Sequence, residues 1–313
     1  MTTLAPAQHA PAPPRTARPS RVGLNLQLFA VCVAIWGSTW MAIKFQLGHV
    51  APEASVAWRF GLASLLLVGV CRVRGETLRF DWRTHRELLL LGAFMFCSGY
   101  VFVYHAERYL VSGLVAVGYT ASPLLNLVAS RVAFGARMSR RVAAGGVLGV
   151  VGIVLVFLPE FAQVRASVGF AWGAAFTMLG VVSASVGNVF AARVSARGLS
   201  VWQQMAWGMA YGAAGSLLAA LLTGQPVGFD ATWPYVLSLG YLALFGSVFA
   251  FAAYLTLLAR TSAAVAGYTG VMVPVVALVL SSLFEHFEWQ ALTFVGVAIA
   301  IAGNLLVLKV TNR

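Results

Sequence analysis

The chain has 313 residues, of which 60% are hydrophobic and only 10% are charged, and its mean hydropathy is +0.85. A soluble domain carries about 25% charged residues, so a water-facing globule is excluded and lipid is the main solvent. The net charge of +12 does not indicate a nucleic-acid partner, because nearly all Lys and Arg lie between apolar runs. The lipid bilayer is the expected partner, and no obligate protein partner is indicated.

Residues 1–23 are rich in Ala and Pro and predict a disordered cytoplasmic extension rather than a signal peptide. A spanning helix needs about 20 mostly apolar residues, and the rest of the chain predicts ten such helices. In chain order they cover residues 25–45, 54–71, 88–104, 111–130, 142–158 and 169–192, two helices within 200–259, then 262–284 and 289–308.

The positions of the charges predict the orientation. With the N-terminus in the cytoplasm, most of the 21 Lys and Arg lie on the cytoplasmic side, as the positive-inside rule requires. The acidic residues expected on the outer side are Glu53, Glu107, Glu160, Asp230, Glu285 and Glu288. We therefore expect a multi-pass protein of a bacterial-type inner membrane with both termini cytoplasmic.

The two halves of the chain resemble each other at an offset of about 150 residues, since GLVAVGYTASP at 113–123 matches AAVAGYTGVMVP at 263–274. Each half then holds five spans, and because five is odd the second copy is inverted. We predict an all-α membrane fold of two five-helix inverted repeats, residues 24–160 and 161–313. This architecture is typical of alternating-access transporters, whose substrate site lies between the halves.

Several motifs carry a family resemblance over nearly the whole chain after residue 24. They are AIWGSTWMAIK at 34–44, Pro and Arg in APEASVAWRF at 51–60, GLVAVGYTASP, and FGARMS with the following GG at 134–146. Together they resemble the ten-helix EamA-type branch of the drug/metabolite transporter superfamily. Within it, the aromatic-rich spans are most similar to exporters of aromatic and other amino acids. The resemblance implies a transporter, not an enzyme.

Trp36, Trp40 and Lys44 recur every four residues and form one stripe on the first predicted helix. Two indoles on one face can line a cavity, with the cation at its outer mouth. The alternative is that these residues anchor the helix at the membrane interface, where Trp and Lys are common. For Trp36, which lies deeper in the span, we favour the cavity.

Polar and aromatic stripes recur on several other spans, which together favour a central substrate cavity. Any single Ser or Asn in a span is more often a contact between helices. The candidate cavity residues are Trp36, Ser38, Trp40, Tyr100, Tyr104, Tyr119, Ser122, Asn126, Ser183, Asn188, Tyr254, Tyr268 and Met272. Pro123 and Pro274 are expected to kink two of these helices.

Three charged residues are candidates for gating: Lys44, Arg59 and Glu107. Arg59 lies inside the second span, where an unpaired charge is costly. We interpret it as half of an ion pair with Glu53 or Glu107 rather than as a substrate contact.

The fifth and tenth spans have small residues on one face, which predicts that they are scaffold helices that pack closely together. These residues are Gly145, Gly149, Gly152, Gly296, Ala300 and Gly303. The three cysteines have no metal-binding spacing, and we expect no metal, cofactor or catalytic residue.

These patterns predict a secondary transporter that exports small amphiphilic solutes, above all amino acids or related metabolites. A multidrug or other metabolite exporter of the same fold is the main alternative. A membrane-embedded enzyme would need a nucleophile–base pair or a metal cluster, and a channel would need charged rings or filter loops. The absence of carboxylates near the middle of the predicted spans favours facilitated diffusion over proton antiport.

Overall fold

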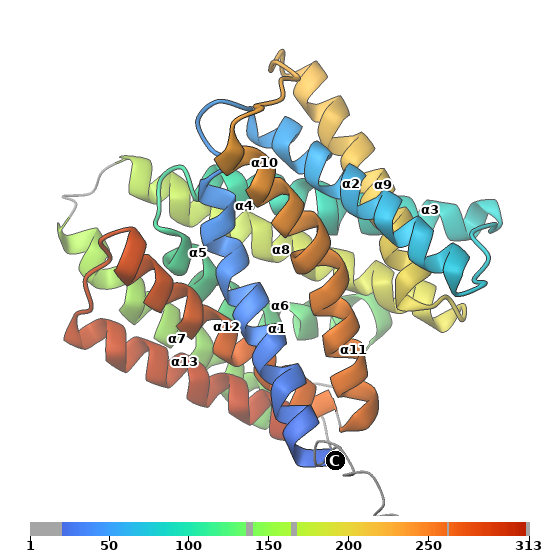
Figure 1. The fold of residues 1–313 in the computed structure, drawn as a ribbon. Helices are drawn as coiled ribbons and strands as arrows, with labels where there is room; N and C mark the ends of the chain where they lie inside the picture. Colours follow the sequence, from blue (N-terminus) through green and yellow to red (C-terminus); the bar gives the residue numbers. More distant parts are fainter. Residues whose placement is uncertain (1–20, 136–139, 164–167, 262, 311–313) are drawn as a thin grey trace, which may run out of the picture.

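A computed structural model describes residues 21–310, except 136–139, 164–167 and 262. The predicted disordered extension, residues 1–23, lies almost entirely outside the described residues. The described part is helical and forms one bundle (Figure 1).

The helices follow the predicted apolar segments, although several extend beyond them. In chain order they are α1 (Arg21–Lys44), α2 (Pro52–Val73), α3 (Trp82–Leu91), η1 (Gly92–Ser98), α4 (Gly99–Ala106), α5 (Ser112–Gly118), η2 (Tyr119–Ala121), α6 (Ser122–Phe134), α7 (Arg140–Gln163), α8 (Val168–Ala196), α9 (Val201–Leu222), α10 (Trp233–Gly240), η3 (Tyr241–Phe249), α11 (Ala250–Arg260), α12 (Ala263–Phe284) and α13 (Ala291–Val310). Three runs are continuous rods built of shorter pieces, namely α3–η1–α4, α5–η2–α6 and α10–η3–α11.

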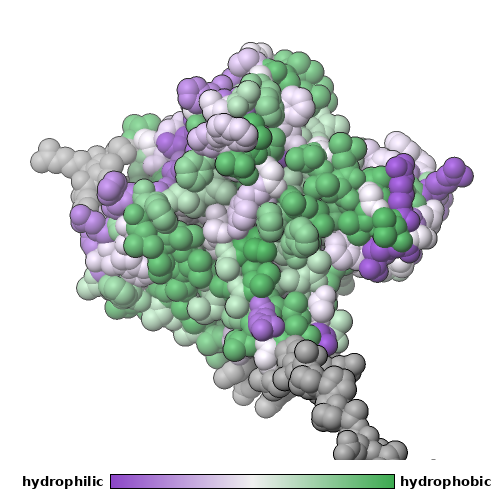
Figure 2. Space-filling model, in the orientation of Figure 1, coloured by the Kyte–Doolittle hydropathy of each residue, from purple (hydrophilic) through white to green (hydrophobic). Residues whose placement is uncertain are grey.

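Eight helical stretches in the described part of the chain are long and apolar enough to cross a membrane. Shorter apolar stretches, Ala143–Pro159 in α7 and Ala291–Leu306 in α13, lie where the fifth and tenth spans are predicted. Figure 2 shows a broad apolar surface with polar residues gathered toward its edges, as a lipid-facing bundle requires. The chain is therefore a membrane protein whose described residues form an all-helical bundle with eight candidate spans.

The bundle has two ends, which we name from the chain. α1 begins and α13 ends at the terminal end, whereas α1 ends and α2 begins at the distal end. In Figure 1 the terminal end lies at the bottom, near the mark for the C-terminus.

α7 and α13 run along each other at one edge of the bundle (Figure 1). A Cβ atom added to Gly152 would lie 2.5 Å from the Ala300 nitrogen and 2.5 Å from the Gly296 oxygen. One added to Gly303 would lie 2.5 Å from the Gly145 oxygen. The prediction that these two small-residue faces pack together is confirmed, because only glycine permits such an approach.

The segments η1 and η3 are π-helical and were not predicted from the apolar pattern. In each, a serine hydroxyl donates to a carbonyl five residues earlier: Ser98 to the Ala93 oxygen and Ser247 to the Leu242 oxygen, both at 3.0 Å. A serine can satisfy a carbonyl that a widened turn leaves without its regular partner. The two π segments thus share a position in the third and eighth predicted spans and a local bonding pattern.

Candidate functional site

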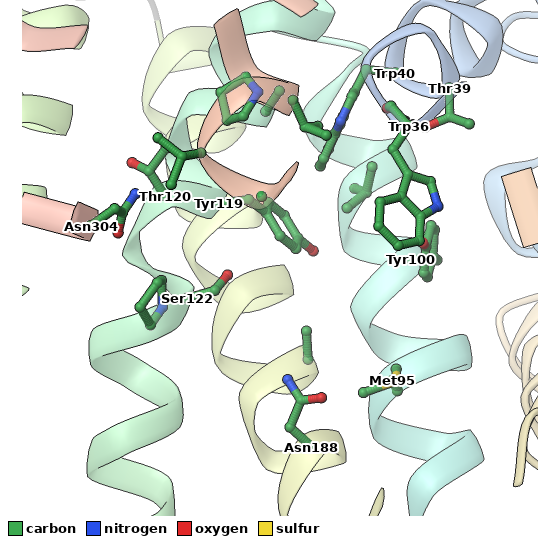
Figure 3. A pocket seen from close by; sticks show the side chains of 18 of the residues that line it. Trp36, Thr39, Trp40, Met95, Tyr100, Tyr119, Thr120, Ser122, Asn188 and Asn304 are labelled. Atoms are coloured by element: carbon green, nitrogen blue, oxygen red, sulfur yellow. Dashed lines mark hydrogen bonds between the residues drawn. The ribbon is translucent and has the colours of Figure 1, made fainter. Parts of the chain in front are cut away.

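A cavity of about 400 Å³ lies between helices from both halves of the chain. This volume is within the range of sites for small molecules, about 300–1,000 Å³. Aromatic residues supply much of its wall: Trp36, Trp40, Tyr100, Tyr119 and Phe251. Figure 3 shows the four of these that it labels gathered around one space.

Ring contacts hold the aromatic wall in place. The Trp36 ring lies 5.1 Å from Phe251 and 5.4 Å from Tyr254, centroid to centroid, and the Trp40 ring lies 5.1 Å from Tyr119. The Trp36 indole also donates to the Gly246 oxygen at 3.1 Å. Because Gly246 belongs to η3, the π segment helps to orient the indole in the cavity.

Small polar groups interrupt the apolar lining. Thr39, Thr120, Ser122, Asn188 and Asn304 all line the cavity, and Figure 3 shows Asn188 well apart from Trp40 along the bundle. An apolar wall with a few polar groups suits a solute that has both an apolar body and polar ends.

The structure brings six of the thirteen predicted cavity residues into the lining: Trp36, Trp40, Tyr100, Tyr119, Ser122 and Asn188. Three others lie just outside the lining, and two of them contact lining residues. The Ser38 hydroxyl is 2.7 Å from the Tyr241 hydroxyl, Asn126 accepts from Asn188 at 3.1 Å, and Tyr254 packs on Trp36.

The other four predicted cavity residues are not in the lining. Tyr104 is fully buried and donates to Gln46 at 2.5 Å. Ser183 and Tyr268 are partly exposed, and Met272 is 37% exposed, all outside the lining. A position on a polar helical stripe therefore does not by itself determine which neighbour a side chain meets.

Several lining residues were not predicted as site residues, among them Thr39, Met95, Thr120 and Asn304. Asn304 carried a signal, because an asparagine in a strongly apolar span is costly without a partner or a cavity. It also corrects the interpretation of the tenth span as scaffold alone, since α13 contributes this side chain to the cavity.

Lys44 lies at the distal end of the cavity, where gating was predicted. Its ammonium donates to the Glu107 backbone oxygen at 2.6 Å and to the Leu110 oxygen at 2.7 Å, and it lies 3.3 Å from the Glu285 carboxylate. These bonds tie the end of α1 to the loop before α5 and to the end of α12.

The Glu285 carboxylate continues this network. It accepts from the Ser112 backbone nitrogen at 3.0 Å, from the Ser112 hydroxyl, and from the Ser281 hydroxyl at 2.5 Å. We call Lys44, Ser112, Ser281 and Glu285 the distal latch, because together they join α1, α5 and α12. Glu107 lies beside it, and burial raises the pKa of its carboxyl.

The cavity is closed at the distal end and opens toward the terminal end. Ile43, Val103 and Ala116, which line it next to the distal latch, are at most 2% exposed. Asn188, eight residues or about two turns before the end of α8 at the terminal end, is exposed. A solute in the cavity would thus reach solvent on the terminal side.

The predicted ion pair of Arg59 with Glu53 or Glu107 does not form in this structure. Glu53 instead binds His105, at 2.8 Å, and none of the ion pairs found in the described part of the chain includes Arg59. The Arg59 guanidinium lies over the rings of Tyr100 and Phe60, 4.7 and 5.1 Å from their centroids. Sequence spacing could not predict this, because charge alone favoured the carboxylates.

A multi-pass helical bundle with a solute-sized internal cavity that is open at one end is the arrangement of a membrane transporter. In the described residues, no group of three or more His, Cys, Asp or Glu is placed to hold a metal ion. The model of the EamA-like transporter family matches residues 25–158 and again 171–309. The chain belongs to this family.

Several relatives of this chain are named as transporters. It is 31% identical over 282 residues to "Uncharacterized inner membrane transporter YedA" of Escherichia coli K12, covering 88% of each chain. It is 26% identical to "Uncharacterized transporter YvbV" of Bacillus subtilis, covering 90% of each chain. A solved structure titled "Crystal structure of protein" shares the fold, with a TM-score of 0.65 at 19% identity over 94% of this chain and 99% of that one.

Proposed function

We propose that this protein is a secondary transporter that exports small amphiphilic solutes, above all amino acids including aromatic ones. The observation that carries the proposal is the cavity of about 400 Å³ walled by Trp36, Trp40, Tyr100 and Tyr119. Aromatic faces bind the apolar body of such a solute, and the nearby hydroxyl and amide groups bind its polar ends.

We further propose that transport follows alternating access between two inverted repeats, residues 24–160 and 161–313, with ten spans in all. The helix contacts support this. α2 packs on α9 and α7 packs on α13, and the two helices of each pair are five spans apart in the chain. α1 packs on α12 as α6 packs on α8, which is the same contact with the two halves exchanged. The two matching π segments support it as well. Rocking of the halves would close the terminal side and release the distal latch.

The proposed location is the inner membrane, which agrees with the name of the Escherichia coli relative, with both termini in the cytoplasm. Reporter fusions after residues 80, 138 and 197 should then show cytoplasmic activity, and those near 50, 163 and 227 periplasmic activity, because basic loops stay inside. A fusion at residue 80 with periplasmic activity would contradict the orientation and the inverted repeat together.

Flux into liposomes tests the substrate class. Purified protein should carry labelled aromatic amino acids faster than empty liposomes do. Flux equal to that of empty liposomes for every amino acid, with strong movement of a lipophilic cation, would favour the multidrug alternative instead.

Trp36→Ala should lower this flux by roughly tenfold or more, because aromatic contacts carry much of the binding in such a cavity. The variant should remain largely folded, since a cavity wall contributes less to packing than a filled core. Trp172→Ala is the matched control: this tryptophan is 54% exposed on α8 and lies outside the lining. Equal flux loss in both variants would contradict a role for Trp36 in the site.

A further inference from the structure

We propose that Arg59 is the anion-binding residue of the cavity and that the transported solutes carry a carboxylate beside an apolar or aromatic body. The inference rests on the proposed transport function and narrows its substrate class. It gives Arg59 a role in binding rather than in an ion pair within the protein.

The first support is an unsatisfied guanidinium. Arg59 is 3% exposed and lines the cavity, yet its Nε and Nη1 atoms have no hydrogen-bond partner. A buried arginine normally uses its donors in a planar fork that matches two oxygens of one carboxylate. A carboxylate that enters the cavity could therefore supply the acceptors that this lining arginine lacks.

The second support is the charge of the cavity. Arg59 is the charged residue of the lining, and no Asp or Glu of the described chain belongs to it. A buried charge at membrane depth is costly unless it is paired, so an anion is favoured and a lipophilic cation is repelled. The π faces of Tyr100 and Phe60 offset part of this cost, but they do not use the in-plane donors.

The third support is the position of Arg59 relative to the aromatic wall. The guanidinium lies 4.7 Å from the centroid of Tyr100, whose ring is itself part of the lining. A carboxylate on the guanidinium would therefore place its attached apolar group among the aromatic side chains. The guanidinium would thus contact the carboxylate of an amphiphilic anion while the aromatic side chains contact its apolar group.

Glu107 is the competing partner, because both of its carboxylate oxygens are also buried without hydrogen bonds. Its side chain does not pair with Arg59 in this structure, and it does not line the cavity. If Arg59 served only to balance the charge of Glu107, adding Glu107→Gln to Arg59→Gln would restore the carboxylate binding that Arg59→Gln alone had lost.

Equilibrium binding of three labelled probes to wild-type protein in nanodiscs tests the inference. 3-Phenylpropionate carries only a carboxylate, 2-phenylethylamine only an ammonium, and phenylalanine both. We expect the two carboxylates to bind about 10- to 100-fold more tightly than the amine, the usual effect of a charged hydrogen-bonded contact. The ranking is measured on the wild type, so it decides the matter even if a variant fails to fold.

Variants then assign the effect to Arg59. Arg59→Gln should weaken the binding of both carboxylate probes by that same factor and leave the binding of the amine unchanged. Arg59→Lys should retain part of the affinity for the carboxylates. Arg72→Gln, at the exposed last turn of the same helix, is the matched control and should bind like the wild type.

The inference is overturned if the amine binds as tightly as the acids, if neither carboxylate binds, or if folded Arg59→Gln keeps its carboxylate affinity. It is also overturned if adding Glu107→Gln to Arg59→Gln restores carboxylate binding. If 3-phenylpropionate binds and phenylalanine does not, and if this binding is lost in Arg59→Gln, the inference is supported while amino-acid export fails. Undiminished phenylalanine flux through Arg59→Gln would support export while the inference fails.

Discussion

Gly152→Leu should reduce the yield of folded protein on the order of tenfold. The contact between α7 and α13 leaves no space for a side chain there, because the Gly296 and Ala300 backbone atoms lie 2.5 Å from the position of an added Cβ. Backbone cannot turn away as a flexible side chain can, so the helices must separate, at a cost of about 3 kcal/mol or more. Size-exclusion profiles and thermal unfolding of detergent-solubilised protein measure the loss.

The control for this prediction is Gly69→Leu. Gly69 lies in α2 with nothing within 4 Å of an added Cβ, so its variant should fold like the wild type. Gly149→Leu should fall between the two, since its added Cβ meets only the Thr120 oxygen, at 3.8 Å. Equal yields from Gly152→Leu and Gly69→Leu would show that this helix contact is dispensable.

Lys44→Met and Glu285→Gln should each open the distal side of the cavity. Each removes one charge of a pair 3.3 Å apart whose side chains are 26% and 11% exposed. For such a partly exposed pair the loss is on the order of 1–2 kcal/mol, which shifts the ratio of closed to open molecules roughly tenfold. The hydrogen bonds of Ser112 and Ser281 to residue 285 remain possible in Glu285→Gln.

A cysteine in place of Ala116 reports this opening, because Ala116 lines the cavity beside the distal latch and is fully buried. A membrane-impermeant thiol reagent added on the distal side should label it about tenfold faster in either latch variant. The same protein without Ala116→Cys measures background from Cys97, and Glu288→Gln, an exposed carboxylate in the loop after α12, is the charge control. Unchanged labelling would mean that other contacts keep the distal end closed.

Hydropathy was sufficient to predict where the helices lie, because a segment that lies in lipid must be a long, mostly apolar run. It predicted less well where they end: the third span begins at Trp82, within a stretch containing Arg and His. The small-residue faces of α7 and α13 were also predictable, since only a close neighbour explains glycines at such spacing.

The site was predictable only in part, because a helical stripe specifies a direction and not the neighbour found there. Tyr100 and Tyr104 are one turn apart, yet the first lines the cavity and the second is buried against Gln46. Likewise, Glu53 was a reasonable partner for Arg59 by charge and depth, but Glu53 binds His105 from another helix instead of Arg59. Such choices depend on contacts between distant parts of the chain.

The π segment in the third span has a consequence for how this helix tolerates change in length. Its widened turn holds one residue more than an α-helical turn, so every side chain after it is rotated by about 100° relative to an unbroken helix. α3 and η1 contact both α8 and α9, whereas α4 contacts α8 and α2, so the added residue sets the direction in which the α4 side chains face. Removing a single residue between Gly92 and Ser98 would therefore turn Tyr100 away from the cavity while leaving the apolar length of the helix almost the same.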